Sequence, residues 1–436
     1  MDNLAGAIDG EHYNAPMSRK RAMSARREAS SLSSASSRER DSAAKATLKR
    51  GRARPLWFGH PWVYANAVER VEGDAAPGSV LSLFDHDGRF IGRGIYNPRS
   101  QIAVRVLTTV DEPIDGDFFG RRLRVARELR VALGLPNART DAYRLVNSEG
   151  DGLPGLVIDV LGDAIVLQVS TLGMALWRQE ISTAILDLLG PRTLYEVAAA
   201  SFAETEGFLA ETRVVAGESR AVVPCQEDGI LLQAEPLVGQ KTGLFLDQRP
   251  SRMRVGAMVA ASPDKFARVL DCYAYAGGFA LQAGRAGAKE LVAVDSSSRA
   301  IARIEAHARA NGLGIRAVEA DAFRFLETAT PRSYDLVIVD PPKFARARKD
   351  LEAASKGYER LNTLALTVCA PGAVLVSSSC SQNLSAEHFE RVLAGAARLA
   401  AREVRVIEHF GPGPDHPLPS GFAEGQYLKV VFAYVV

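Results

Sequence analysis

The C-terminal half of the chain alternates short apolar runs with amphipathic stretches. Runs such as ELVAVD and DLVIVD are rich in valine and leucine, which is typical of strands buried on both faces of a sheet. Stretches such as SSRAIARIEAHARANG repeat apolar residues with helical spacing. Such alternation over residues 226–436 predicts a doubly wound parallel sheet, whose last strand follows the GPGPDHPLPSG loop and is free to enter antiparallel.

Two further patterns precede this sheet. Over residues 48–109, alternating apolar positions between Asp-Gly and Asn-Pro turns predict short strands of a small barrel or sandwich. Residues 117–133 have helical periodicity with arginines on the outer face, and the strand and helix patterns that follow predict a second α/β unit. Within this unit, SEGDGLPGLVID is typical of a tight turn that joins two strands. A hairpin-like segment over residues 229–252 opens the last region.

We therefore expect three folded domains, at residues 46–115, 116–225 and 226–436, after a tail of residues 1–45. The tail contains the stretch MSRKRAMSARREASSLSSASSRER, which cannot bury a core, so we expect it to be disordered. It is basic, although the net charge of the whole chain is only +2. A solvated tail, a start codon placed too early and a basic arm that contacts RNA phosphates all fit this composition.

Composition and cysteine spacing argue against several classes of protein. With 47% hydrophobic and 24% charged residues over 436 positions, the chain has the composition of a soluble globular protein, and no apolar run approaches membrane-spanning length. The four cysteines have no CxxC spacing and no nearby histidines, which disfavours structural zinc and a disulfide framework. We expect no metal and no membrane contact, and a reducing cytoplasm fits. The oligomeric state stays open, with a homodimer as one option.

The most informative motif places an acid and two prolines at the end of a predicted strand. In LVIVDPPKF, Asp340 ends the strand, and the two prolines form a stiff exit that fixes its direction. A later strand, AVLVSSSCS, ends on Cys380. Ligands of open parallel sheets bind outside the carboxyl ends of the strands, so an acid and a thiol at neighbouring strand ends indicate chemistry there. The simpler alternatives are a strand-ending aspartate and a core cysteine.

Acids also end three other predicted strands, at Asp271, Asp295 and Asp321. After the first of these strands, Gly277 and Gly278 permit close backbone approach to a ligand at the start of a helix. The pattern is neither the dinucleotide fingerprint nor a P-loop. Each acid alone is also a candidate helix cap, but four strand-end acids together favour a cationic, adenosine-containing cofactor, namely S-adenosylmethionine.

These motifs also carry a family resemblance. DCYAYAGGF, VDSSSRAI, ADAFRFL, VDPPKF and SSSCS resemble, in this order, motifs of bacterial S-adenosylmethionine-dependent methyltransferases that make 5-methylcytosine in large-subunit ribosomal RNA. The resemblance covers residues 46–436, where KRGRARPLWFGHPWVYANAV is similar to the N-terminal PUA domain of that family and KTGLFLDQRPSR to its pre-cofactor signature. It implies a small β-barrel PUA domain, a middle α/β domain and a Rossmann-like class I methyltransferase domain, with ribosomal RNA as partner.

Residue chemistry and the resemblance together suggest roles. Carbon 5 of cytosine is a weak nucleophile, so a thiolate must first add at carbon 6. Cys380 is the expected nucleophile, and Asp340 is expected to stabilise the ring through a proton at its nitrogen. By resemblance, Gln248 and Arg249 lie at the amino-acid end of the cofactor, where the guanidinium faces either the cofactor carboxylate or an RNA phosphate. Tyr273 completes the expected cofactor site.

Two regions are expected to contact RNA. At the catalytic domain these are Lys343 and Phe344, whose ring either stacks on the unstacked target base or packs in the core. In the first domain, Arg52, Arg54 and Trp57 combine positive charge with an aromatic surface, which is typical of RNA-binding sites.

Two other functions stay open at this stage. An RNA guanine methyltransferase would leave Cys380 structural. A PUA-type RNA-binding or ribosome assembly factor would carry an inactive cofactor domain, although the intact set of strand-end acids argues against it.

Overall fold

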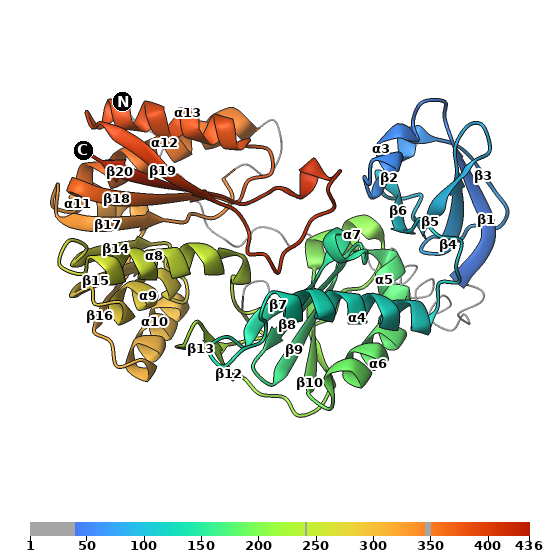
Figure 1. Cartoon of the computed structure of the whole chain (residues 1–436), viewed down its shortest axis with the longest axis horizontal. Coiled ribbons are helices and arrows are strands. Elements are labelled where there is room, and N and C mark those ends of the chain that lie inside the picture. Colours follow the sequence, from blue (N-terminus) through green and yellow to red (C-terminus); the bar gives the residue numbers. More distant parts are fainter. Residues whose placement is uncertain (1–39, 240–241, 345–349) are drawn as a thin grey trace, which may run out of the picture.

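The computed structural model describes residues 40–239, 242–344 and 350–436 (Figure 1). The chain passes from a small β domain through a middle domain to a larger C-terminal domain (Figure 1).

Residues 1–39, most of the expected disordered tail, lie outside the described residues. The tail boundary at residue 45 is wrong, because strand β1 (Asp41–Leu48) already begins at Asp41. Ala44, Ala46 and Leu48 of this strand are buried, and they anchor it in the N-terminal domain.

The N-terminal domain is the predicted assembly of short strands. Its sheet has the order β2-β6-β5-β4-β1-β3, and β1 pairs antiparallel with β3 and parallel with β4. A short helix, α3 (Arg54–Trp57), leads from β1 into β2. The remaining strands are β2 (Trp62–Tyr64), β3 (Val68–Glu72), β4 (Val80–Phe84), β5 (Phe90–Tyr96) and β6 (Ile102–Thr108).

The middle domain is an α/β unit, as predicted, built on a sheet of order β11-β10-β9-β8-β7. Its strands are β7 (Ala142–Asn147), β8 (Leu156–Leu161), β9 (Ala164–Val169), β10 (Thr193–Ala198) and β11 (Arg213–Ala216). Its helices are α4 (Gly116–Ala132), α5 (Leu172–Leu176), α6 (Arg178–Leu189) and α7 (Ala200–Glu206). The predicted outer placement of arginines on α4 is wrong for Arg130, which is fully buried and donates to Asp151 in the turn between β7 and β8.

The predicted hairpin over residues 229–252 is displaced toward the N-terminus. The observed hairpin joins β12 (Val223–Glu227) to β13 (Ile230–Ala234), so the expected domain boundary after residue 225 passes through β12. Asp228 and Gly229 between the strands both have positive φ, 47° and 76°, which is the conformation that favours a two-residue hairpin turn. Farther on, the chain turns into helix α8 (Arg249–Ala261), which has Pro250 in its first turn.

The C-terminal domain is the predicted doubly wound sheet, with order β16-β15-β14-β17-β18-β20-β19. The strands β14 to β18 pair in parallel, whereas β20 is antiparallel to both neighbours. The strands are β14 (Arg268–Cys272), β15 (Glu290–Asp295), β16 (Ile315–Glu319), β17 (Tyr334–Val339), β18 (Cys369–Ser379), β19 (Val404–Phe410) and β20 (Lys429–Val435).

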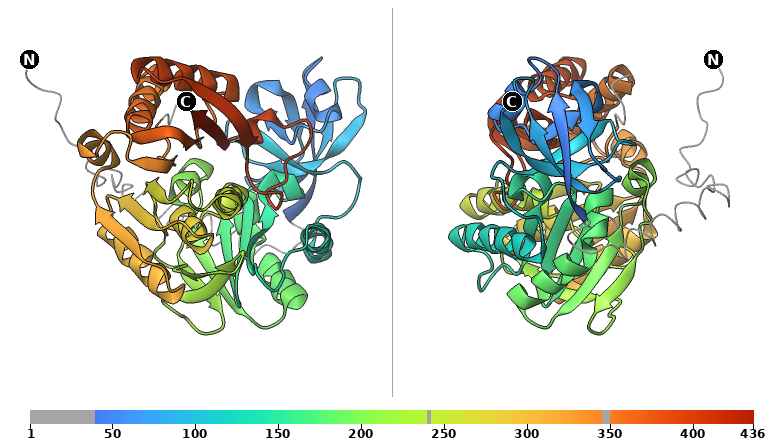
Figure 2. Two further views of the ribbon diagram at one scale, coloured as in Figure 1. Left: turned by 60° about the vertical axis from the view of Figure 1, so that its left-hand side comes forward. Right: turned by 90° about the vertical axis from the view of Figure 1, so that its right-hand side faces the viewer.

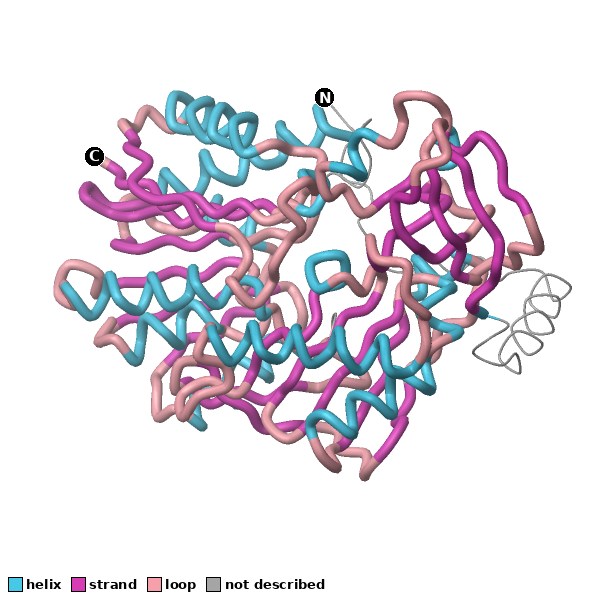
Figure 3. The backbone as a smooth tube through the Cα atoms, turned by 45° about the vertical axis from the view of Figure 1, so that its right-hand side comes forward, coloured by secondary structure: helices cyan, strands magenta, loops and turns pink. Residues whose placement is uncertain are grey.

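Helices cover both faces of this sheet. Helices α8, α9 (Gly278–Arg285) and α10 (Ser298–Ala310) lie on one face, and α11 (Ala322–Thr328), α12 (Leu351–Val368) and α13 (Ala386–Leu399) lie on the other (Figures 1 and 3). The stretch SSRAIARIEAHARANG had predicted α10, whereas no pattern had predicted α8 or α12. Both faces of the central strands are thereby buried, as their continuous apolar runs require.

The three domains share their hydrophobic cores. One core joins the middle domain to Val80, Ile95 and Leu107 of the N-terminal domain. A second core packs the β12–β13 hairpin between the middle sheet and the C-terminal domain, where it reaches Leu281 of α9. Such continuous apolar contact fixes the domains relative to one another.

A loop of residues 411–422 reaches from the C-terminal domain toward the other two (Figures 1 and 2). The ring of Phe422 lies 4.6 Å from that of Trp62 and 5.7 Å from that of His60. A Cβ at Gly421 would come within 2.1 Å of the Phe58 carbonyl oxygen, so the close approach requires glycine. Trp62 is therefore half-buried at a domain interface.

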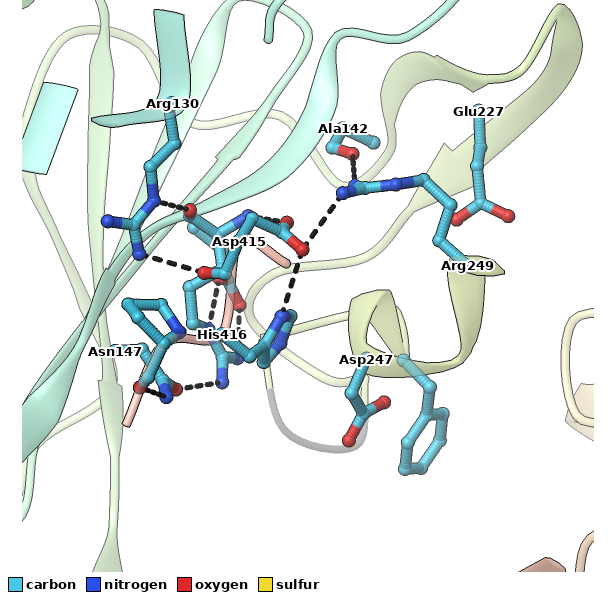
Figure 4. Close-up of polar contacts among 12 residues, drawn as sticks. Arg130, Ala142, Asn147, Glu227, Asp247, Arg249, Asp415 and His416 are labelled. Atoms are coloured by element: carbon cyan, nitrogen blue, oxygen red, sulfur yellow. Dashed lines mark hydrogen bonds and ion pairs between the residues drawn. The ribbon is translucent and has the colours of Figure 1, made fainter. Parts of the chain in front are cut away.

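Asp415 holds this loop against the middle domain (Figure 4). The side chain is fully buried, and its carboxylate contacts Arg249 at 2.8 Å, His416 at 3.1 Å and the Arg144 amide at 3.0 Å. Its backbone carbonyl accepts a hydrogen bond from Arg130. Burial alone would raise the pKa of Asp415, but His416, Arg249 and the Arg144 amide together hold the pKa below the ordinary value.

We expect the Asp415→Asn variant to have a free energy of unfolding about 3 kcal/mol below wild type, because removal of the charge leaves Arg249 buried without its counter-ion. Since the folded pKa of Asp415 is lowered, its contribution is present above pH 3.8 and is lost as the pH falls below that value. Urea unfolding at pH 7 measures the difference. The matched control is Asp264→Asn, which removes a surface ion pair with Lys289 and should change little. Equal stability of Asp415→Asn and wild type would contradict this role.

Candidate functional site

The predicted acids and the thiol lie along one edge of the large sheet. Neighbouring strands in the order β16, β15, β14, β17, β18 present their carboxyl ends there. In this order the edge carries Asp321, Asp295, Asp271, Asp340 and Cys380. Parallel pairing brings together residues that are more than 100 positions apart in the chain, as the sequence analysis expected.

Asp340 and Cys380 end neighbouring strands. The register of β17 and β18 places Asp340 level with Ser378, so Cys380 lies two residues farther out. Gln248 connects the two strands, because its Nε2 donates to Asp340 Oδ2 at 2.9 Å and to Ser378 Oγ at 3.3 Å. The prediction that Asp340 and Cys380 lie at the ends of neighbouring strands is confirmed.

Cys380 differs from the other cysteines in its surroundings. It is half-buried, whereas Cys225, Cys272 and Cys369 are buried. Burial raises the pKa of each of these three thiols, that of Cys369 to about 12. A buried thiol with a raised pKa is a poor nucleophile near neutral pH, so Cys380 is the cysteine suited to chemistry.

Tyr358 on α12 faces both strand ends, and the sequence analysis missed it. Its hydroxyl accepts a hydrogen bond from Ser379 Oγ at 3.1 Å. Burial, together with the charges of Cys380 and Asp340, raises the pKa of Tyr358 to about 12, so the phenol stays protonated near neutral pH. The only local signal was the apolar spacing of α12, which is interrupted by Gly357.

Asp271 is the most deeply buried acid of the edge. Its Oδ2 accepts from the Ala280 amide at 3.1 Å, while Oδ1 has no partner among the described residues. Burial, and to a lesser extent the charges of Asp340 and Asp295, raises the pKa of Asp271 to about 7. A buried acceptor without a partner is costly, so the site is suited to a ligand that donates a hydrogen bond or carries positive charge.

Asp295 and Asp321 have local structural bonds, as the alternative interpretation allowed. Asp295 accepts from the amides of Tyr275 and Ser297 at 2.9 and 3.0 Å. Asp321 caps α11 through the Arg324 amide and is exposed. Asp321 is thus the cap of α11, whereas the cap of α10 is Ser297 rather than Asp295. Both carboxylates lie at the same edge of the sheet.

The turn after β14 has unusual backbone geometry. Tyr273 and Tyr275 have positive φ of 61° and 50°, and Gly277 has 76°. Such a run is strained for side chains other than glycine and is typical of ligand-binding turns. Gly278 has a packing role, because a Cβ there would lie 2.6 Å from Cδ of Arg252. Burial raises the pKa of Tyr273, so its phenol also stays protonated.

Arg249 is placed differently from the prediction. Its buried guanidinium contacts Asp415 and donates to the Ala142 carbonyl at 3.2 Å, on the side of the middle domain (Figure 4). The positive charge of this guanidinium is already compensated by a buried carboxylate, which disfavours binding of a second anion. The expected pairing of Arg249 with the cofactor carboxylate or an RNA phosphate therefore finds no support, and the partner Asp415 was missed because it lies 166 residues later in the chain.

The residues expected to meet RNA are partly accessible. Lys343 is exposed, whereas Phe344 is half-buried, with its ring 4.6 Å from that of Tyr358 and 6.4 Å from that of Phe323. These contacts favour the packing interpretation of Phe344.

The basic-aromatic cluster of the N-terminal domain lies on its surface. Arg52 and Arg54 are exposed, and Trp57 is 52% exposed. A concave surface beside them also includes Lys49 and Asp85. An exposed tryptophan flanked by arginines is suited to stacking on a base beside a phosphate.

The described residues contain neither a cluster suited to a metal ion nor a helix suited to crossing a membrane. Within residues 40–239, 242–344 and 350–436, no cluster of histidine, cysteine and acidic side chains could hold a metal ion. Over the same ranges, no helix has the length and apolar character needed to cross a membrane.

Comparison with known proteins identifies the family. A PUA-like domain matches residues 46–109, and the S-adenosylmethionine-dependent methyltransferase family matches residues 210–423. The ribosomal RNA large subunit methyltransferase I of Aeromonas salmonicida is 36% identical over 389 residues, which cover 88% of this chain and 97% of that protein. The protein of the same name from Photobacterium profundum is 37% identical over 396 residues, covering 89% and 98%. The chain belongs to this methyltransferase family.

The fold and the cofactor agree with this membership. A crystal structure of a candidate methyltransferase complexed with S-adenosylhomocysteine superimposes with a TM-score of 0.76 at 22% identity, covering 89% of this chain and 99% of that one. This likeness supports the fold. The protein is thus an S-adenosylmethionine-dependent methyltransferase with an N-terminal PUA-like domain and a Rossmann-like catalytic domain, as the sequence predicted.

We expect the Asp271→Asn variant to be more stable than wild type at pH 8 in the absence of ligand. The folded pKa of about 7 lies above the ordinary 3.8, so the folded state binds more protons across this window and its stability falls as the pH rises through it. Asparagine keeps an acceptor for the Ala280 amide but cannot ionise. The gain should be about 2 to 4 kcal/mol at pH 8 and near zero at pH 4.

Urea unfolding at both pH values measures this gain. Asp321→Asn is the control, because asparagine caps a helix as well as aspartate does and the site is exposed. A gain at pH 8 no larger than that of the control would show that Asp271 is not held in a costly ionised state.

Proposed function

We propose that the enzyme transfers a methyl group from S-adenosylmethionine to carbon 5 of a cytosine in large-subunit ribosomal RNA, through a covalent adduct on Cys380. The observation that carries the proposal is the placement of Asp340 and Cys380 on neighbouring strand ends that Gln248 bridges. The names of the curated relatives support the ribosomal RNA substrate. The half-buried thiol supports nucleophilic catalysis, since the other described cysteines are buried.

The proposed mechanism begins with the thiolate of Cys380, which forms a bond to carbon 6 of the cytosine ring. The electron pair that moves into the ring is stabilised by a proton that Asp340 holds at the ring nitrogen, and this makes carbon 5 nucleophilic. S-Adenosylmethionine supplies the electrophilic methyl group. Loss of the carbon-5 proton then breaks the bond between Cys380 and carbon 6, which restores both the aromatic ring and the thiolate.

The strand-end residues fit such a cofactor. Gln248 Oε1, like Asp271 Oδ1, is a buried acceptor without a partner among the described residues. Two such acceptors suit a ligand with a cationic centre and amine donors. We assign the cofactor to the edge formed by Gln248, Asp271, Tyr273, Gly277, Gly278, Asp295, Asp321 and Asp340.

We assign RNA contacts to Lys343 and to the cluster of Arg52, Arg54 and Trp57. The PUA-like match over residues 46–109 and the exposure of the cluster support this assignment. In a double Arg52→Gln, Arg54→Gln variant, loss of two phosphate contacts should lower the slope of log binding constant against log salt by about 1.5. Filter binding over a salt series measures the slope, and an unchanged slope would remove the cluster from the RNA interface.

We expect the Cys380→Ala variant to lose methyl transfer by at least about a thousandfold, because the ring cannot be activated without the covalent adduct. Nucleoside analysis of ribosomal RNA after incubation with labelled cofactor measures 5-methylcytidine. The control variant is Cys369→Ala, which truncates a buried thiol at the amino end of β18, opposite the carboxyl end that leads to Cys380, and should remain active.

Calorimetry with S-adenosylmethionine checks that the Cys380→Ala variant still binds its cofactor and is folded. Full activity of this variant would rule out the thiolate mechanism and would favour a guanine target, with Cys380 as a structural residue.

A further inference from the structure

Lys429 lies beside the strand end that carries Cys380. It is the first residue of β20, which runs antiparallel to β18, and its partner across the two strands is Ser379. Its backbone is therefore adjacent to the residue that precedes the thiol. The sequence analysis placed no function on this position, because a lysine that begins a strand is usually a surface residue.

The side chain of Lys429 is bound to the turn that follows the thiol. Its Nζ donates to the carbonyl oxygens of Ser381 and, at 2.8 Å, of Leu384. The side chain is half-buried, so these two carbonyls hold the ammonium at a defined position under the turn. An ammonium has three donors, and these bonds account for two of them.

The charged groups that act on Lys429 are Cys380 after β18 and Lys343 after β17. Burial lowers the pKa of Lys429 to about 8, the charge of Cys380 opposes this change, and Lys343 adds to it. The interaction between a thiolate and the ammonium is mutual, so a thiolate that favours the charged lysine is itself favoured by it.

We propose that Lys429 is a positioning residue. Its ammonium stabilises the thiolate of Cys380 and fixes the turn that follows this cysteine. The thiol proton leaves to solvent, and the lysine keeps its own proton, so an ion pair replaces a neutral thiol beside a cation. This inference rests on the proposed function only for the role of the thiolate as nucleophile, because the inferred ion pair does not involve RNA.

The test measures the reactivity of Cys380 in the full-length protein without RNA. Alkylation by iodoacetamide is followed from pH 5 to pH 10 by tandem mass spectrometry, which locates the modified cysteine within a peptide. Fragmentation is needed because no lysine or arginine lies between Cys369 and Cys380. The Lys429→Gln variant keeps amide donors for the two carbonyls but removes the charge. The Lys429→Arg variant keeps the charge and is the matched control.

We expect the alkylation midpoint of Lys429→Gln to lie about one pH unit above wild type, and that of Lys429→Arg to stay within a few tenths of a unit. Thermal unfolding identifies any variant that fails to fold. The Lys343→Gln variant removes the other lysine charge beside Lys429, and it should move the midpoint less than Lys429→Gln does. A folded Lys429→Gln variant with the wild-type midpoint would overturn the proposal.

Failure of this inference is distinguishable from failure of the proposed function. An unchanged midpoint in Lys429→Gln, with an inactive Cys380→Ala variant, would remove Lys429 from the mechanism and leave the nucleophile in place. A raised midpoint with a fully active Cys380→Ala variant would establish the ion pair but not covalent catalysis.

Discussion

The buried ion pair between Arg249 and Asp415 joins the start of α8 to the 411–422 loop. These two segments flank the proposed catalytic edge, which is the sheet edge that carries Asp340 and Cys380. Arg249 follows Gln248, whose amide bridges Asp340 and Ser378, so its position sets where that bridge lies. Asp415 belongs to the 411–422 loop, which leads into the strand that carries Lys429. One interaction at the border of the middle domain thus supports the residues on either side of the proposed nucleophile.

The same loop connects the PUA-like domain to the C-terminal domain. Phe422 packs on Trp62 of the PUA-like domain, close to the helix that carries Arg54 and Trp57. The shared hydrophobic cores hold the three domains together independently of this contact. RNA bound at the N-terminal domain would therefore meet a catalytic edge at a fixed distance and orientation, without a hinge between the two.

The catalytic edge is built at a cost in stability. Asp271 is buried with a pKa raised to about 7, and the acceptors on Asp271 and Gln248 have no partner among the described residues. A protein selected only for stability would replace such groups with asparagine or an apolar residue. Their presence is understandable if a cationic ligand compensates for them when it binds.

Most of the catalytic sheet could be predicted because local signals agreed there. Each central strand is a continuous apolar run that ends on a polar residue, and parallel pairing places these ends together whatever the length of chain between them. Helices α8 and α12 were missed because Pro250 and Gly357 are typical of breaks, although proline is tolerated in the first turn of a helix. The contacts that Arg249 and Arg130 make with Asp415 could not be predicted, since tertiary contacts across more than 100 residues leave no local pattern.

The central claim is that Cys380 forms a covalent bond to the target cytosine during methyl transfer. It is tested most directly with large-subunit ribosomal RNA transcribed with 5-fluorocytidine, in which fluorine replaces the proton that must leave carbon 5. Incubation with enzyme and S-adenosylmethionine, followed by mass spectrometry of the cross-linked peptide, should yield a methylated nucleotide attached to the peptide that contains Cys380. Absence of any adduct on an enzyme that methylates unmodified RNA, or an adduct on a different cysteine, would contradict the account.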